Sequence, residues 1–259
     1  MLKPIGIFDS GVGGTSIWRE LNKLLPNEHT VYLADSKNAP YGTKSKEKIT
    51  QLCMKNTELL LEQHCKLIVV ACNTATTNAI DYLRENYNVP FIGIEPAIKP
   101  AALKTETKNV GVLATKGTLS SNLFHNTSKL FAEGITIIEQ EGTGLVELIE
   151  AGKVNSEKTR ALLKKYIDPM LQKNIDCLVL GCTHYPYLVP LLEDFLPNGV
   201  HIIDSGEAVA RQTQAVLLQN QLLAEEKGTV RHSFYSNSNV EVLQNLVNGD
   251  NVTVAYKDF

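Results

Sequence analysis

The stretch LIVVACNT at residues 67–74 has a close counterpart in CLVLGCTH at residues 177–184. Each is an apolar run that ends in a small residue, a cysteine and then residues with hydroxyl, amide or imidazole side chains. Uninterrupted apolar runs of this length are typical of parallel strands that are buried on both faces. Because open α/β sheets bind ligands at the carboxyl ends of their strands, the sequence predicts one thiol at each of two such ends, Cys72 and Cys182.

The start of the chain is repeated in the same way. IGIFDS at residues 5–10 is echoed by VGVLAT at residues 110–115. The spacing from Gly6 to Cys72 is 66 positions, and the spacing from Gly111 to Cys182 is 71. Near-equal spacing predicts two related lobes that face each other. If a pseudo-twofold axis relates them, the two cysteines approach one ligand from opposite sides, which suits a racemase or an epimerase.

Apolar strand patterns alternate with helical patterns along the chain. This predicts an α/β fold of two similar, doubly wound lobes with mostly parallel sheets and the active site between them. The expected strands lie at 5–9, 30–35, 65–72, 90–94, 110–114, 135–139, 177–180, 201–203, 230–235 and 252–256. The clearest expected helices lie at 45–64, 74–87, 156–172, 186–195 and 206–220. Ser45 is the predicted N-cap of the first of these helices.

The stretch from Pro96 to Pro100 marks the expected crossing into the second lobe. The two strands of the tail are expected to return to the first lobe. We therefore expect residues 1–97 and 207–259 to form the first lobe and residues 98–206 to form the second.

Composition narrows the class of protein. The 259 residues are 20% charged and 43% apolar, with a formal net charge of -3. There is no basic field to hold nucleic acid, and no apolar run approaches the ~18 residues that a membrane span needs. The start, MLKP, lacks the features of a signal peptide. These features predict a cytoplasmic enzyme that binds neither nucleic acid nor membrane, with its five cysteines reduced.

The segment DSGVGG at residues 9–14 follows the first expected strand and opens a helix. Its glycines allow the backbone to approach a ligand closely, and the start of the helix offers free N–H groups. A dinucleotide fingerprint would need glycine where Ser16 stands, and the lysine of a P-loop is absent, so a nucleotide site is not expected. A tight turn capped by Asp9 is the plainer alternative. Asp9 and Cys72 both end strands of one lobe and are expected to face one crevice, where Asp9 would accept protons or hold a substrate ammonium group.

A single buried cysteine is usually a small core residue, and three cysteines are interpreted in this way: Cys53, Cys65 and Cys177. A zinc site within either cysteine segment is excluded by distance, since seven residues of strand span ~23 Å and five span ~17 Å. A composite zinc site of Cys72, Cys182 and His184 remains an alternative.

His184 lies two residues after Cys182. A lone histidine at a strand end is often only a satisfied polar residue. Beside a thiol, however, an imidazole can take the thiol proton or, when charged, lower the pKa of the thiol. Pro40-Tyr41-Gly42 is a turn whose N–H groups and tyrosine hydroxyl could bind a carboxylate, although alone it indicates only a turn.

Four motifs stand in order along the chain: DSGVGG at 9–14, PYG at 40–42, ACNT at 71–74 and GCTHYP at 181–186. With them, the sequence closely resembles the bacterial glutamate racemases over essentially its whole length. The resemblance implies an enzyme without cofactor or metal that interconverts L- and D-glutamate, the D-isomer being used for peptidoglycan. It also implies a homodimer.

The resemblance further implies that Cys72 and Cys182 act as acid and base on opposite faces of the α-carbon. Cys72 would remove the proton from D-glutamate and Cys182 the proton from L-glutamate, assisted by Asp9 and His184 respectively. The residues expected to contact the substrate are Asp9, Ser10, Pro40, Tyr41, Gly42, Asn73, Thr74, Thr115, Thr118, Thr183 and His184.

The family also has an assisting glutamate ahead of the second cysteine, and Glu150 is its match. Glu147 stands where the family has proline, so Glu147 remains an alternative for this role. Thr15 stands where the family usually has leucine and is expected to affect helix packing rather than chemistry.

The chemistry itself calls for more than two thiols. A proton next to a carboxylate is very weakly acidic, so the crevice must stabilise developing negative charge, and hydroxyl and amide donors are suited to this: Ser10, Asn73, Thr74 and Thr183. Two alternatives remain. One is an aspartate racemase of the same superfamily, because one methylene changes binding by only ~1–3 kcal/mol. The other is a non-catalytic amino-acid sensor, which would not need both cysteines.

Overall fold

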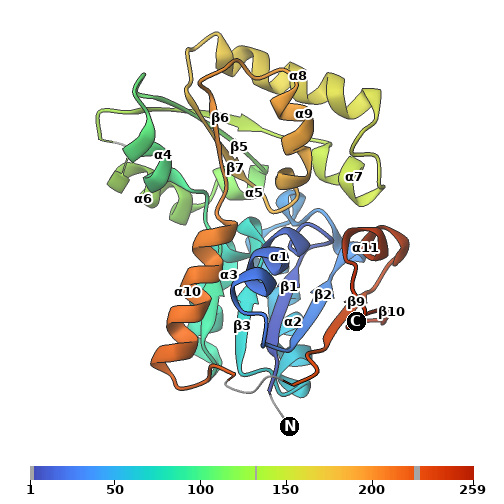
Figure 1. Cartoon of the computed structure of the whole chain (residues 1–259). Helices are drawn as coiled ribbons and strands as arrows, with labels where there is room; N and C mark the ends of the chain where they lie inside the picture. Colours follow the sequence, from blue (N-terminus) through green and yellow to red (C-terminus); the bar gives the residue numbers. More distant parts are fainter. Residues whose placement is uncertain (1–2, 132, 225–227) are drawn as a thin grey trace.

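The computed structural model describes residues 3–131, 133–224 and 228–259. Met1 and Leu2 of the start considered above lie outside the described residues. The chain forms two parallel sheets, each covered by helices, as Figure 1 shows. The expected α/β architecture is therefore confirmed.

The larger sheet has six parallel strands in the order β10-β9-β2-β1-β3-β4. We call this sheet and its helices the first lobe. Its strands are β1 (Ile5–Asp9), β2 (Thr30–Ala34), β3 (Leu67–Val70), β4 (Phe91–Gly93), β9 (His232–Ser236) and β10 (Val252–Tyr256). Its helices are α1 (Thr15–Leu24), α2 (Lys46–Glu62), α3 (Asn73–Asn86), α10 (Gly206–Gln219) and α11 (Glu241–Leu246).

The smaller sheet has four parallel strands in the order β6-β5-β7-β8, and with its helices it forms the second lobe. Its strands are β5 (Asn109–Ala114), β6 (Thr136–Glu141), β7 (Cys177–Gly181) and β8 (His201–Ile203). Its helices are α4 (Ile98–Lys104), α5 (Lys116–Leu119), α6 (Asn122–Phe131), α7 (Leu145–Glu150), α8 (Glu157–Leu171) and α9 (Val189–Glu193).

The two sheets repeat one strand order. β2-β1-β3-β4 in the first sheet corresponds to β6-β5-β7-β8 in the second. The register agrees as well, since Phe8 pairs with Val70 and Leu113 pairs with Leu180. Cys72 and Cys182 each lie two residues beyond these paired positions. The repeat seen in the sequence is thus a repeat of structure, and it brings the two thiols to equivalent strand ends.

The central strands β1, β2, β3 and β7 are buried on both faces because apolar side chains point to each side of the sheets. One apolar cluster joins the inner faces of both lobes, and it includes Ile7 and Val69 from the first sheet and Leu178 and Leu180 from the second. The opposite face of the first sheet packs against α2 and α3 through a separate cluster that includes Phe8 and Val70. Shared burial across the lobes holds their sheets close to one another.

Several expected elements differ at their ends. The strand expected at 65–72 stops at Val70, because Cys72 is the N-cap of α3, where its sulfur accepts the N–H of Ala75. The helix expected at 186–195 is a 3₁₀ turn at Tyr185–Leu188 followed by α9, and the ring of Pro190 removes a donor at the junction. Ser45 caps α2 as expected, accepting the N–H of Lys48. The tail strand β9 pairs with β2, so the tail does return to the first sheet.

Candidate active site

A small cavity lies between the two lobes, at the carboxyl ends of β1, β3 and β7. The empty space at this site, counting the part that is open to solvent, is about 240 Å³. Both cysteines predicted from the repeat line it. The full lining is Ser10, Pro40, Tyr41, Gly42, Cys72, Asn73, Thr74, Thr115, Val146, Cys182, Thr183 and His184. Of the residues expected from the sequence, Asp9, Thr118 and Glu150 do not line this cavity but contact residues that do.

Cys72 is held by the start of α3. Its sulfur accepts the N–H of Ala75 at 3.4 Å and lies 3.7 Å from the hydroxyl oxygen of Ser10. Burial raises the pKa of the Cys72 thiol well above its usual value, and the charge of Asp9 raises it further, against the lowering effect of those two hydrogen bonds. The raised pKa favours the protonated thiol form of Cys72.

Asp9 ends β1 and is fully buried. One carboxylate oxygen accepts the N–H groups of Gly11 and Gly14 at 3.3 and 3.0 Å, and the other accepts the hydroxyl of Thr183 at 3.3 Å. Burial raises the pKa of Asp9 to about 6, although the charge of His184 and the Gly14 N–H lower it. A carboxylate with this pKa exchanges protons near neutral pH, which suits an assisting base.

Cys182 is paired with His184. Its sulfur lies 3.7 Å from Nδ1 of the imidazole, and the other ring nitrogen, Nε2, lies 2.6 Å from Oε1 of Glu150. Burial alone would lower the pKa of His184, but its hydrogen bonds to Cys182 and Glu150 outweigh burial and raise the pKa well above its usual value. The imidazole can therefore hold a proton taken from the Cys182 thiol.

Glu150 fixes which nitrogen faces the thiol. Burial alone would raise the pKa of Glu150, but His184, the N–H of Val12 and the hydroxyl of Ser36 together lower it, so the side chain is a carboxylate. A carboxylate only accepts hydrogen bonds, so in its 2.6 Å contact with Glu150 the Nε2 of His184 is the donor, although the backbone nitrogen of Gly13 also lies 3.2 Å from Nε2. Nδ1 of the neutral ring is then free to accept the proton of Cys182.

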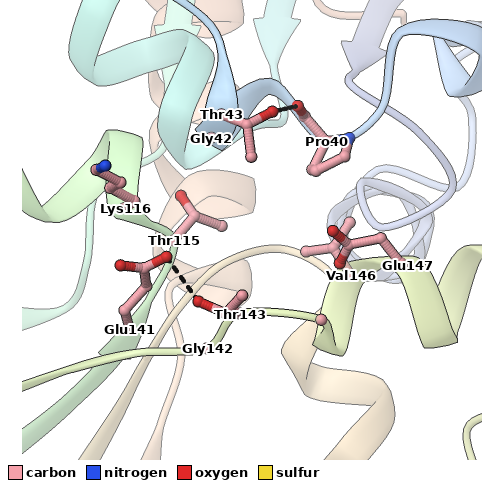
Figure 2. Close-up of a pocket in the computed structure, with 11 residues that line it drawn as sticks. Pro40, Gly42, Thr43, Thr115, Lys116, Glu141, Gly142, Thr143, Val146 and Glu147 are labelled. Atoms are coloured by element: carbon pink, nitrogen blue, oxygen red, sulfur yellow. Dashed lines mark hydrogen bonds between the residues drawn. The ribbon is translucent and has the colours of Figure 1, made fainter.

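Glu147, the alternative to Glu150, has a different position. It lines a neighbouring hollow that shares Pro40, Gly42, Thr115 and Val146 with the cysteine cavity and opens beside it. Figure 2 shows this mouth, with the Pro40–Thr43 turn of the first lobe facing Thr115, Val146 and Glu147 of the second. Glu147 is thus placed at the mouth of the cavity, whereas Glu150 contacts His184.

The glycines of the DSGVGG segment allow the second lobe to approach the first. A β-carbon on Gly11 would overlap the carboxylate of Glu150, and one on Gly13 would overlap the ring of His184. The sequence predicted close approach by a ligand at this loop. The structure shows instead that the groups nearest to these glycines are protein side chains, which reach across from the second lobe.

Asn73 is the most exceptional polar residue of the cavity. Its side chain is buried, and neither its amide nitrogen nor its carbonyl oxygen has a hydrogen-bond partner among the described residues. Burying an unpaired amide costs free energy that a bound ligand recovers. Asn73 is therefore placed and primed to bind a polar ligand.

Three threonine hydroxyls meet across the lobes beside Asn73. Thr74 lies 2.7 Å from Thr115 and 3.3 Å from Thr118, and Thr115 lies 3.1 Å from Thr118. Thr74 lies in the first turn of α3 in the first lobe, and the other two belong to the α5 region of the second. Hydroxyl groups can donate or accept, so this cluster can turn its protons toward an anionic ligand.

The Tyr41 hydroxyl, expected to be free for a carboxylate, is engaged elsewhere. It donates to Oδ2 of Asp35 at 2.5 Å and accepts from Asn56 at 3.2 Å. This part of the expectation is wrong, because Asp35 is the nearest strong acceptor behind the turn. The backbone of Tyr41 and Gly42 still lines the cavity.

Other contacts of the site had no signal in the sequence. The N–H of Val12 and the hydroxyl of Ser36 both donate to Glu150, over separations of 138 and 114 residues. Thr15, expected to affect only helix packing, lies 2.5 Å from the hydroxyl of Tyr187 across the lobes. Contacts between lobes depend on the complete fold, so no local pattern marks them.

Metal binding has no arrangement to support it. Within residues 3–131, 133–224 and 228–259, no three His, Cys, Asp or Glu side chains are placed to share one ion. The alternative zinc site of Cys72, Cys182 and His184 is therefore not formed. Over the same residues, none of the helices combines the length and the apolar character needed to span a bilayer.

The cavity brings two thiols from two repeated lobes to one ligand site, as in a racemase that works from both faces of a carbon. A family model described as Asp/Glu/hydantoin racemase matches residues 5–213. The chain belongs to this family.

Curated relatives narrow the comparison. The protein called glutamate racemase from Ectopseudomonas mendocina is 49% identical over 93% of this chain and 92% of its own. The glutamate racemase of Stutzerimonas stutzeri is 46% identical, and the match covers 98% of this chain and 97% of that protein.

Solved structures agree with them. Glutamate racemase from Escherichia coli, in complex with L-glutamate and the activator UDP-MurNAc-ala, is 34% identical with a TM-score of 0.86, covering 99% of this chain and 98% of its own. The glutamate racemase from Francisella tularensis, in complex with D-glutamate, is 29% identical with a TM-score of 0.82. The match covers 98% of this chain and 97% of that protein. Picrophilus torridus aspartate racemase, at 20% identity and a TM-score of 0.54, shares the fold.

Proposed function

We infer that this protein is a glutamate racemase, an isomerase that interconverts L- and D-glutamate and, as the family implies, supplies D-glutamate for peptidoglycan. The observation that carries this proposal is the placement of Cys72 and Cys182 on one small cavity, each at the same strand end of a repeated lobe. The similarity to glutamate racemases at 46–49% identity supports glutamate over aspartate. A sensor would have no need of the second thiol.

In the proposed reaction, the Cys182 thiolate removes the α-proton of L-glutamate, and Cys72 delivers its own proton to the opposite face. D-glutamate leaves, with Cys182 now a thiol and Cys72 a thiolate. The reverse direction starts from that second state. His184 and Glu150 assist the thiol of the second lobe, and Asp9 assists that of the first.

Negative charge builds on the substrate α-carboxylate as the proton leaves. We propose that Ser10, Asn73, Thr74 and Thr183 donate hydrogen bonds to the substrate and stabilise this charge. The unpartnered amide of Asn73 supports this role. Thr115 and Thr118, with the Pro40-Tyr41-Gly42 turn, are proposed to bind the remainder of the substrate from the side of the mouth.

We also propose that residues 1–97 and 207–259 form one domain and residues 98–206 the other. Membership of the two sheets supports this division, since β1 to β4 with β9 and β10 form one sheet and β5 to β8 form the other. The homodimer and the cytoplasmic location remain predictions from the sequence.

The test is direct. Purified protein, dialysed against a chelator, is incubated with L-glutamate while optical rotation is followed to zero. Aspartate is the matched control substrate. Activity that survives dialysis, without an absorbance band of bound pyridoxal phosphate, agrees with the two-thiol mechanism. Faster racemisation of aspartate, or activity that returns only with added metal, would contradict the proposal.

A further inference from the structure

Glu150 belongs to the second lobe, yet most of its hydrogen-bond donors belong to the first. Oε1 accepts the N–H of Val12 at 2.6 Å, and Oε2 accepts the hydroxyl of Ser36 at 2.8 Å. Only His184, whose Nε2 shares Oε1 with Val12, comes from the same lobe as Glu150. Glu150 and His184, which we propose to assist Cys182, are therefore held in part by hydrogen bonds from the opposite lobe.

The two oxygens of Glu150 have different roles. Oε1 bears both the bond to His184 and the bond to Val12, while Ser36 is the donor to Oε2 among the described residues. Contacts on both oxygens fix the rotation of the carboxylate plane. Without Ser36, the carboxylate can turn Oε2 toward His184 or toward solvent, since the side chain is 14% exposed at the lobe boundary.

We propose that Ser36 is a positioning residue for the Cys182 half of the reaction: by anchoring Oε2 of Glu150, its hydroxyl keeps Oε1 on Nε2 of His184 and so keeps Nδ1 facing Cys182. This inference rests on the proposed racemase function. Ser36 does not line the cysteine cavity, so it acts through Glu150 and His184 and not on the substrate.

The effect is confined to one face. Cys72 is held by Ser10 and the N–H of Ala75, and Asp9 by Gly11, Gly14 and Thr183. None of these contacts includes Ser36. Loss of its hydroxyl should therefore weaken proton removal by Cys182 and leave proton removal by Cys72 unchanged.

Other titratable groups lie near Glu150 and His184, and a test of Ser36 must leave them unchanged. Asp9 and Tyr32 of the first lobe, and Cys182 and Tyr187 of the second, act electrostatically on Glu150 or His184. Ser36 contacts none of the four in the described structure. A change at Ser36 thus reaches His184 through Glu150.

Racemisation rates cannot reveal such asymmetry. Enantiomers have equal free energies, so kcat/KM must be the same in both directions for every variant. Elimination from 3-chloroglutamate avoids this constraint: the base removes the α-proton, chloride leaves the β-carbon, and the resulting enamine tautomerises and hydrolyses to 2-oxoglutarate and ammonium. Only the abstracting thiol is needed, so each enantiomer reports on one face.

The experiment compares Ser36→Ala with Ser36→Thr, which keeps the hydroxyl, and with Ser45→Ala, which removes the capping serine hydroxyl of α2, a group that bonds Lys48 and has no hydrogen bond to Glu150 among the described residues. In Ser36→Ala, we expect elimination from L-3-chloroglutamate to fall about tenfold and elimination from the D-isomer to stay within about twofold, because one hydrogen bond to a charged group is lost. Ser36→Thr should restore the L-rate, and Ser45→Ala should match the wild type.

A second readout is independent of activity. In protein labelled with ¹⁵N-histidine, with His184 assigned by comparison with His184→Asn, the pH midpoint of the imidazole should fall in Ser36→Ala and be unchanged in Ser36→Thr. An unchanged midpoint, or equal losses from both chloroglutamate enantiomers, would overturn the proposal. If the wild type failed to racemise glutamate, the proposed function would fall, while the His184 midpoint would still decide the role of Ser36.

Discussion

The two thiols of the cavity have unlike neighbours. Cys72 lies near a carboxylate and a hydroxyl, and its pKa is raised by burial and by Asp9. Cys182 lies against an imidazole that can take its proton. Equivalent strand ends thus present one thiol suited to start as an acid and one suited to start as a base. The proposed handedness of the reaction, with Cys182 facing L-glutamate, is taken from the family resemblance.

Changing the thiols one at a time should separate the faces. Because elimination needs only the abstracting base, Cys72→Ser should keep elimination from L-3-chloroglutamate, and Cys182→Ser should keep it from the D-isomer. Both variants should lose racemisation, since each turnover needs both groups and a serine hydroxyl is a far weaker base. Release of 2-oxoglutarate measures the rates. Reversed preferences would show that the faces are assigned wrongly.

Asp9 gives a prediction about stability and pH. Its pKa in the folded protein is about 6, against 3.8 as the ordinary value, so the folded state holds this proton more tightly than the unfolded state. By linkage, the charged form destabilises the fold above pH 6, by about 3 kcal/mol at most, and this penalty disappears as the pH falls toward 4.

Asp9→Asn should therefore be more stable than the wild type at pH 8 and closer to it at pH 4.5, while losing activity. The amide oxygen of asparagine can still accept the N–H groups of Gly11 and Gly14, and its nitrogen can face Thr183. Urea unfolding at the two pH values measures the gap. A gap that is the same at both would show that the Asp9 carboxylate carries no burial penalty.

At the scale of elements, the loop between β1 and α1 contacts the second lobe directly. Its glycines leave room for Glu150 and His184, which approach from α7 and from the turn after β7. Because its glycines carry no side chains, the loop leaves room for the two groups of the second lobe that we propose to assist Cys182.

Gly13→Ala should displace the His184 ring, because the new methyl group would occupy the space of the imidazole. We expect elimination from L-3-chloroglutamate to fall more than about tenfold, with a smaller effect on the D-isomer. Gly228→Ala is the matched control, since no atom of the described residues lies within 4 Å of a β-carbon there. Equal losses from both enantiomers would indicate general disruption of the cavity.

The helices and strands also show which features of the fold could be predicted from the sequence. Strand positions were readable because buried parallel strands leave apolar runs, and both cysteines were found because they end two matching runs. The single helix expected at 186–195 is wrong, because prolines such as Pro190 indicate where a helix can start but do not show that two short elements follow each other. Ser36 and Val12 were missed because their partner, Glu150, is more than a hundred residues away and belongs to a helix of the other lobe.

At the scale of the whole molecule, the site exists only between the lobes. Each sheet delivers one thiol, and neither lobe alone encloses the cavity. Cross-lobe hydrogen bonds from Thr183 to Asp9, from Val12 to Glu150 and between Thr15 and Tyr187 join the two halves. Two bases fixed in different lobes cannot exchange places during turnover.

Racemisation in deuterated water should therefore place deuterium in the product well before it appears in the remaining substrate. One thiol removes the substrate proton and the other, already exchanged with solvent, delivers deuterium to the opposite face. Mass spectrometry of the separated enantiomers at early times measures both. Equal early labelling of substrate and product would indicate a single base that serves both faces.

The shared strand order of the two sheets has a consequence for how such a catalyst can arise. A half-length chain with the order β2-β1-β3-β4 and one cysteine would, as a twofold dimer, present identical thiols across its symmetry axis. Such a dimer would place one thiol on each side of a ligand bound at the axis. Fusing the halves into one chain frees each copy to diverge, and here the divergence is visible: the strand end that carries Asp9 in one half carries Ala114 in the other.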